Sequence, residues 1–218
     1  MAIHIEVFPF NPFQENTYVI SDDNKNCVII DPGCYESEEE QTLLAYINDN
    51  GLNPLALLNT HAHIDHVLGN SYIIEKFKLD YYLHTDDIAT LNAVPNYAHA
   101  YGFQGYKTSP QPTHILKGGE KLKFGEIEFD VLFTPGHAPG HVVFYNAQNK
   151  FVINGDVLFK GSYGRVDLPG GSMEVLKKTI AEIMFQLPED TTVFCGHGPS
   201  TTIGAEKRTN YILMEMAR

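Results

Sequence analysis

The sequence predicts an α/β protein, in which short strands and amphipathic helices follow one another along 218 residues. The chain opens with short segments rich in Val, Ile, Phe and Tyr that turn residues separate, and a segment of helical periodicity follows them. The second half has the same plan, sheet and then helix, without a repeat at the level of residues. No linker interrupts the chain, so we expect a single domain over residues 1–218.

Pro, Asn and Asp separate the first apolar segments, which predicts strands over residues 3–8, 17–21 and 27–30. A helix is expected next, because Ser37 and Glu40 have the spacing of a capping box. Apolar residues then recur at helical spacing up to Gly51, which is a plausible stop signal. One amphipathic helix is therefore expected after the first strands.

A short strand at residues 56–59 precedes the motif THAHIDH, and residues 67–77 have the pattern of a helix. Residues 92–112 contain prolines, glycines and tyrosines without clear periodicity, which predicts a long irregular excursion that could form a lid or a substrate wall. Further strands are expected at 127–133, 141–145, 151–154 and 192–195, and further helices at 173–186 and 204–216.

Composition and charge exclude several classes of function. The formal net charge of -12 disfavours nucleic acid as a partner, because such binding depends on clustered Lys and Arg. The three cysteines are widely spaced and odd in number, which indicates neither a disulfide framework nor a structural zinc finger. No secretory leader and no apolar run of about 18 residues is recognisable. We therefore expect a cytoplasmic protein without a membrane partner.

The motif THAHIDH places His61, His63, Asp65 and His66 between two apolar segments. Side chains two residues apart on an extended turn point the same way, so His61 and His63 have the spacing of metal ligands. Several titratable groups between apolar segments would be costly to bury unless they were paired or bound to metal. The motif therefore predicts a metal centre, with zinc as the first candidate.

His137, Asp156 and His197 each follow an apolar strand and stand beside glycine. With the four residues of THAHIDH they make seven metal-type ligands, which are too many for one zinc ion. The set divides into two sites if a carboxylate bridges two ions. His141 is expected to be structural rather than a ligand, and we expect ordinary roles for the lone histidines His4, His84, His99 and His114.

The chain resembles the metallo-β-lactamase superfamily through THAHIDH, TPGH, NGDVLF and CGHGP, in that order. The resemblance covers nearly the whole length and implies a four-layer αββα sandwich. It also implies that His61, His63 and His137 hold one metal, that Asp65, His66 and His197 hold the other, and that Asp156 bridges. Within the superfamily, QENTYVI, VIIDPG and GSYGRVDLPGG are similar to glyoxalase II (hydroxyacylglutathione hydrolase) and its short, single-domain relatives.

This resemblance implies a thioesterase that cleaves small-molecule S-acyl thiols such as S-lactoylglutathione. A hydroxide that bridges two divalent ions would attack the carbonyl, and Asp65 would orient it as the catalytic carboxylate. Asp31 is a candidate to hold a ligand histidine, or else a turn former. Arg165 stands where glyoxalase II has a glutathione-binding lysine, but it could instead pair with Asp167.

Several alternatives stay open at this stage. Asp167 and Pro199 fall where glyoxalase II has tyrosines, so the thiol is open. A persulfide dioxygenase with a single iron, a lactonase or esterase of the same superfamily, and a non-catalytic binding module are the rival interpretations. Zinc, iron and manganese all suit mixed His and Asp ligands. The sequence does not decide between a monomer and a homo-oligomer.

Overall fold

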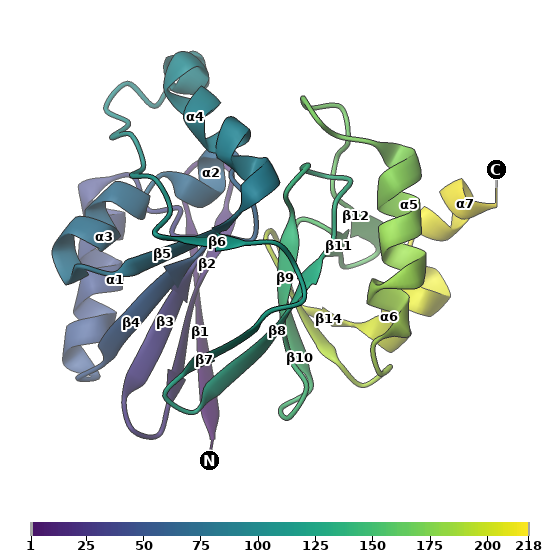
Figure 1. Ribbon diagram of the computed structural model, residues 1–218, viewed down its shortest axis with the longest axis horizontal. Helices are drawn as coiled ribbons and strands as arrows, with labels where there is room; N and C mark the ends of the chain where they lie inside the picture. Colours follow the sequence, from purple (N-terminus) through teal and green to yellow (C-terminus); the bar gives the residue numbers. More distant parts are fainter. Residues whose placement is uncertain (1, 218) are drawn as a thin grey trace. The chain divides into compact units, whose positions relative to one another are not determined.

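The computed structural model describes residues 2–217, which divide into two compact units (Figure 1). The first unit contains the chain up to Leu116 together with Lys123–Glu128, and the second contains Lys117–Leu122 and the remainder from Phe129. The single domain predicted over residues 1–218 stays a prediction, and its two end residues lie outside the described range. None of the described helices has the length and apolar character needed to cross a membrane.

The first unit is built on a six-stranded sheet in the order β1-β2-β3-β4-β5-β6. β1 to β3 pair antiparallel, whereas β3 to β6 run parallel to one another. All residues of β2 are buried, as expected for a strand inside a sheet. The strands are β1 (Ile3–Phe10), β2 (Glu15–Asp22), β3 (Asn26–Ile30), β4 (Asn53–Leu58), β5 (Asp80–His84) and β6 (His114–Leu116).

Two of the helices in this unit, α1 (Ser37–Asp49) and α3 (Asn70–Phe77), lie close to the predicted positions, whereas the short α2 (Ile64–Val67) was not predicted because THAHIDH was expected to lie on a turn. The apolar side chains of α1 and α3 join the core over the sheet. The predicted capping box of Ser37 and Glu40 is displaced by one residue. The Glu39 carboxylate accepts hydrogen bonds from the backbone N–H groups of Tyr35 (2.8 Å) and Glu36 (3.2 Å), so Glu36 is the N-cap.

The excursion predicted over residues 92–112 is irregular only in part. The helix α4 (Ile88–Tyr97) occupies its beginning, after the short turn η1 (Thr85–Asp87), and η2 (Ala98–Tyr101) follows. Pro95 lies inside α4, in the third turn from its start, where it removes one backbone donor without ending the helix. The prediction of an irregular segment was wrong for this part. The helix forms despite Pro95 because the buried Leu91 and Val94 pack against the core.

The second six-stranded sheet has the order β14-β13-β10-β9-β8-β7, and β11 and β12 form a small ribbon. These strands belong to the second unit, except for the end of β7 and the start of β8, which are part of the first. The predicted helix over 173–186 changes to a tighter turn after Ile183, and the predicted helix over 204–216 divides at Asn210. The strands are β7 (Lys121–Phe124), β8 (Ile127–Phe133), β9 (Val142–Asn146), β10 (Phe151–Gly155), β11 (Leu158–Phe159), β12 (Ser162–Tyr163), β13 (Thr192–Cys195) and β14 (Thr201–Thr202). The helices are α5 (Met173–Glu182), η3 (Met184–Gln186), α6 (Ile203–Thr209) and α7 (Ile212–Met216).

The three cysteines are thiols outside any disulfide and are fully buried, and their chemistry should follow from that burial. Burial raises the pKa of Cys27 and of Cys195 to about 12, and it raises the pKa of Cys34 as well. Because the thiolate is the reactive form, we expect the native protein to resist iodoacetamide at pH 8 and all three thiols to react once it is unfolded. Mass spectrometry of the alkylated protein measures this, and rapid labelling of the native chain would contradict it.

Candidate metal centre

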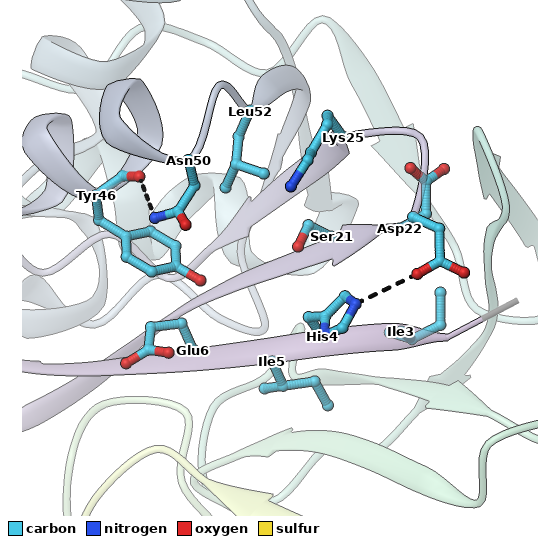
Figure 2. A pocket seen from close by; sticks show the side chains of 11 residues that line it. Ile3, His4, Ile5, Glu6, Ser21, Asp22, Lys25, Tyr46, Asn50 and Leu52 are labelled. Atoms are coloured by element: carbon cyan, nitrogen blue, oxygen red, sulfur yellow. Dashed lines mark hydrogen bonds and ion pairs between the residues drawn. The ribbon is translucent and has the colours of Figure 1, made fainter.

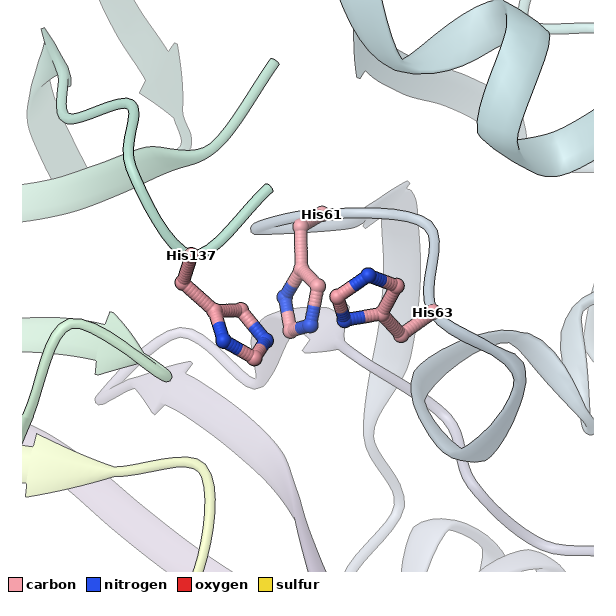
Figure 3. Close-up of side chains that lie close together, drawn as sticks. All are labelled: His61, His63 and His137. Atoms are coloured by element: carbon pink, nitrogen blue, oxygen red, sulfur yellow. The ribbon is translucent and has the colours of Figure 1, made fainter. Parts of the chain in front are cut away.

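The predicted ligands of the first unit lie where the parallel strand β4 ends and α2 begins. His61 and His63 are on the connecting loop, and Asp65 and His66 are in the first turn of α2. The ring centroids of His61 and His63 are 4.8 Å apart, and those of His61 and His66 are 4.1 Å apart. Figure 3 shows His61 and His63 extending from this loop, and it shows His137 on a separate loop. The first unit therefore brings its histidines together, as the motif predicts.

Asp31, directly after β3, holds His66 through a hydrogen bond. The Nδ1 atom of His66 is 3.2 Å from Asp31 Oδ2, and both residues are almost completely buried. Asp31 has a left-handed backbone (φ 50°) at the turn after β3. Asn59 Nδ2 and Thr60 N–H donate to Asp31 Oδ1 at 3.1 and 2.7 Å. Both carboxylate oxygens thus accept protein hydrogen bonds, which suits an orienting role rather than that of a ligand.

Thr60 extends this network to His61. Its hydroxyl donates to Asp31 Oδ2 at 2.6 Å, so the oxygen is left to accept from His61 Nδ1, which is 3.0 Å away. The proton of the neutral ring is then on Nδ1 and the lone pair is on Nε2. One carboxylate in this way fixes the orientation of His66 directly and that of His61 through a hydroxyl.

Two side chains from distant segments hold the backbone of the same loop. The fully buried Asp87 accepts the N–H of Ala62, between His61 and His63, at 2.7 Å. Asn11 donates from Nδ2 to the backbone carbonyl of Asp65 at 3.1 Å. Because these contacts join the loop to η1 and to the turn after β1, the spacing of the histidines is set by the fold around them.

Glu15 is a fully buried carboxyl group beside the same histidines. Burial raises its pKa well above the usual value, although the neighbouring His66 opposes this shift. Its Oε1 atom is 3.7 Å from His66 Nδ1, and Thr17 donates to Oε2 at 3.0 Å. Glu15 thus lies against the side of His66 that Asp31 also occupies.

In the second unit, Asp156, His137 and His197 all follow strands of one sheet. Asp156 comes directly after β10 and His197 comes just after β13, and these two strands are parallel, so both residues stand at the same sheet edge. Asp156 Oδ2 is 3.5 Å from Nε2 of both histidines. His137 Nδ1 donates to the carbonyl of Arg165 at 2.7 Å, which leaves its lone pair on Nε2.

Arg165 has an exposed side chain that is paired within its own loop. Its Nε and one terminal nitrogen donate to the two carboxylate oxygens of Asp167, each at 2.7 Å. These hydrogen bonds hold the pKa of Asp167 down, at about 2. The alternative in which Arg165 pairs with Asp167 therefore describes the structure, while a contact with substrate stays a prediction.

The donor atoms fit divalent metal ions. His61, His66 and His137 each give their Nδ1 proton to an oxygen, so Nε2 is the nitrogen able to bind a metal. Carboxylates stand beside these nitrogens: Asp65 Oδ2 is 3.8 Å from His66 Nε2, and Asp156 Oδ2 is 3.5 Å from His137 Nε2. Mixed imidazole and carboxylate donors suit zinc, iron and manganese.

Thr60, Asp87 and Glu15 were not singled out by the sequence patterns. Thr60 stands inside THAHIDH and Glu15 begins the fully buried strand β2, so polar residues at buried strand ends were the available signal. Asp87 gave no such signal, because only the fold brings η1 to Ala62.

A separate hollow of about 570 Å³ lies in the first unit between β1, β2 and the end of α1 (Figure 2). It contains none of the predicted ligands. His4 in its wall is 3.3 Å from Asp23, which fits the ordinary role expected for this histidine.

Replacement of Asp31 by asparagine is expected to weaken zinc binding by about 10–100-fold, since it removes the charge that orients His66. Asparagine tolerates the left-handed backbone at this position, so the turn itself should survive. Titration of metal-depleted protein with Zn²⁺ in the presence of a competing chelator measures the change. Asp86→Asn is the control, because it removes the same charge from a side chain that is 55% exposed. Equal affinities of the two variants would refute the role of Asp31.

Comparison with known protein families gives a match to the metallo-beta-lactamase superfamily over residues 10–197. The chain is 36% identical over 212 residues to the hydroxyacylglutathione hydrolase GloC of Haemophilus influenzae, covering 97% of this chain and 98% of that protein.

Two solved structures resemble the chain over nearly its whole length. The BLEG-1 B3 metallo-beta-lactamase has a TM-score of 0.88 and 37% identity, with 96% of this chain and 99% of that chain covered. TTHA1623 in a di-iron-bound form has a TM-score of 0.85 and 40% identity, with 95% and 99% covered. The predicted fold class is confirmed by these matches.

Proposed function

Because the chain belongs to the metallo-beta-lactamase superfamily, we propose that it is a dinuclear metallohydrolase of glyoxalase II type that cleaves small S-acyl thiols. The family assignment itself supports an enzyme, a metallo-hydrolase. One arrangement carries the finer proposal. In each unit, a histidine gives its Nδ1 proton to an oxygen and has a carboxylate beside its Nε2 atom.

We assign the seven predicted ligands to two divalent ions, with zinc as the first candidate and iron or manganese as alternatives. The division follows the family resemblance: His61, His63 and His137 for one ion, Asp65, His66 and His197 for the other, and Asp156 for both. Such ions lower the pKa of a bound water toward about 7 and polarise a carbonyl group.

The chain's own residues orient the reacting groups. Asp31 and Thr60 fix the rings of His66 and His61, and Asp65 is assigned to orient the attacking water. A thiol has a pKa near 8.5 and leaves readily as a thiolate, so a thioester needs no further general acid. A reaction without a general acid fits this site, because the residues assigned to it are metal ligands and their hydrogen-bond partners.

The proposal is tested by the metal content of the purified protein together with a substrate panel. We expect two ions per chain and thiol release from S-lactoylglutathione or from the same acyl group on a neutral thiol. The panel also contains a lactone, a β-lactam, and a persulfide supplied with oxygen. Iron alone, at one ion per chain and with sulfite formed, would replace the hydrolase with a persulfide dioxygenase. Turnover of the lactone or β-lactam alone would exclude the thioesterase.

Arg165 is proposed to contact a carboxylate of the thiol part of the substrate. Arg165→Ala should then raise KM for a glutathione thioester by about tenfold and leave kcat unchanged. The lost charge-assisted hydrogen bond would stabilise the bound substrate and the transition state equally. Asp167→Ala should lower that KM, since it releases the guanidinium from its present partner. Steady-state kinetics with a glutathione thioester and with a neutral thioester measure both effects. An equal change for the two substrates would speak against this contact.

A further inference from the structure

We propose that His141 is a positioning residue for Asp156, and that it sets the metal affinity of the chain through a hydrogen bond to the Asp156 backbone. His141 is fully buried and stands directly before β9, whereas Asp156 comes directly after β10. The two strands are antiparallel with Ile153 opposite Phe144. Beyond that pair β10 is irregular between Ile153 and Gly155, and His141 contacts Asp156 through its side chain. The inference rests on the metal centre proposed above.

The contact joins the backbone of Asp156 to the side chain of His141. The N–H of Asp156 donates to His141 Nε2 at 3.1 Å. A backbone N–H can only donate, so Nε2 must carry the lone pair and the proton of the neutral ring is on Nδ1. His141 is thus a hydrogen-bond acceptor for the turn, and this nitrogen is not available to a metal.

Thr134 completes the network on the other side of the ring. His141 Nδ1 is 3.1 Å from the Thr134 hydroxyl oxygen, and that hydroxyl donates to the backbone carbonyl of His141 at 3.4 Å. The oxygen is therefore left to accept the Nδ1 proton. The Thr134 N–H also donates to the His141 carbonyl, at 2.8 Å. These bonds fix the ring, so the position of its Nε2 atom is defined.

The turn that carries Asp156 is fixed on its other side by Asn154. Asn154 Nδ2 donates to the carbonyls of Gly155 and Leu158 at 2.9 and 2.7 Å, and the N–H of Leu158 donates to Asn154 Oδ1 at 3.3 Å. Gly155 supplies a left-handed backbone (φ 50°) directly before Asp156. With the His141 bond in place, the Asp156 carboxylate is directed toward His137 and His197. Loss of that bond would release the Asp156 N–H while Asn154 still held the ends of the turn.

Two substitutions of His141 separate positioning from simple packing. His141→Gln keeps an acceptor at the position of Nε2, whereas His141→Leu has a similar volume and no acceptor. Asn146→Ala serves as the control, because it removes a buried hydrogen-bonding side chain at the opposite end of β9. Each full-length variant is depleted of metal and titrated with Zn²⁺ against a competing chelator, without substrate.

We expect His141→Leu to bind Zn²⁺ about 10–100-fold more weakly than wild type, and His141→Gln to restore most of the affinity. Asn146→Ala should lose thermal stability and keep its affinity. In wild type, nitrogen NMR of the imidazole should show a protonated Nδ1 and an unprotonated Nε2. Wild-type affinity in His141→Leu, equal losses in the Leu and Gln variants, or a protonated Nε2 would overturn the proposal. Absence of thioester hydrolysis by wild type would refute the proposed function alone, because none of these readouts uses a substrate.

Discussion

Replacement of Asp156 by asparagine is expected to bring the metal content below two ions per chain and to reduce thioester hydrolysis by more than about 100-fold. Asp156 Oδ2 is 3.5 Å from the Nε2 atoms of both His137 and His197, and only 7% of the residue is exposed. Asparagine has nearly the same shape but no charge, so the proposed bridge between two cations would lose the anion that screens their repulsion. The loss should exceed that of Asp31→Asn, because the role proposed for Asp31 is indirect and depends on its hydrogen bond to His66.

Elemental analysis and steady-state kinetics measure this prediction on the same preparation. Asp190→Asn is a matched control in the same unit, since Asp190 is an exposed partner of Lys150. The control should keep its metal ions and its activity. An Asp156→Asn protein with two ions per chain and undiminished turnover would exclude Asp156 as the bridging ligand.

The candidate ligands could be singled out from the sequence because each follows an apolar strand at a sheet edge. THAHIDH follows β4, and Asp156 follows β10. In both places a run of apolar residues is followed by polar residues, and this local pattern can be recognised in the sequence. The predicted orienting role of Asp31 has the same origin. Its position after β3, which runs parallel to β4, places it beside Thr60, whose N–H donates to Asp31 Oδ1.

Contacts between distant segments could not be predicted in this way. Asp87 reaches Ala62 only because β5 lies next to β4 and η1 follows β5, and no spacing in the sequence encodes that approach. The prediction of an irregular segment over residues 92–112 was wrong at its start for a related reason. The helix α4 includes Pro95, and burial of one helical face in the core outweighs the local signal of a proline.

Replacement of Gly164 by alanine is expected to displace Asp156 and to weaken zinc binding at least as much as His141→Leu. A Cβ atom at Gly164 would overlap the backbone carbonyl of Asp156 and would stand 3.0 Å from His137 Nδ1. Backbone cannot move aside as a flexible side chain can, so the turn that carries Asp156 must shift. Overpacking of this kind typically costs about 1–3 kcal/mol of folding free energy, and here it acts on two assigned ligands.

Gly161→Ala separates this displacement from a general loss of stability. Gly161 has a left-handed backbone (φ 77°) with nothing within 4 Å of an added Cβ, so alanine there adds strain of roughly 1–2 kcal/mol without a collision. Both variants should unfold at lower denaturant concentration than wild type, whereas only Gly164→Ala should lose affinity in the Zn²⁺ titration. If both variants lost Zn²⁺ affinity in proportion to their loss of folding stability, general destabilisation would explain the result. The turn after β10 would then have no specific role in holding Asp156.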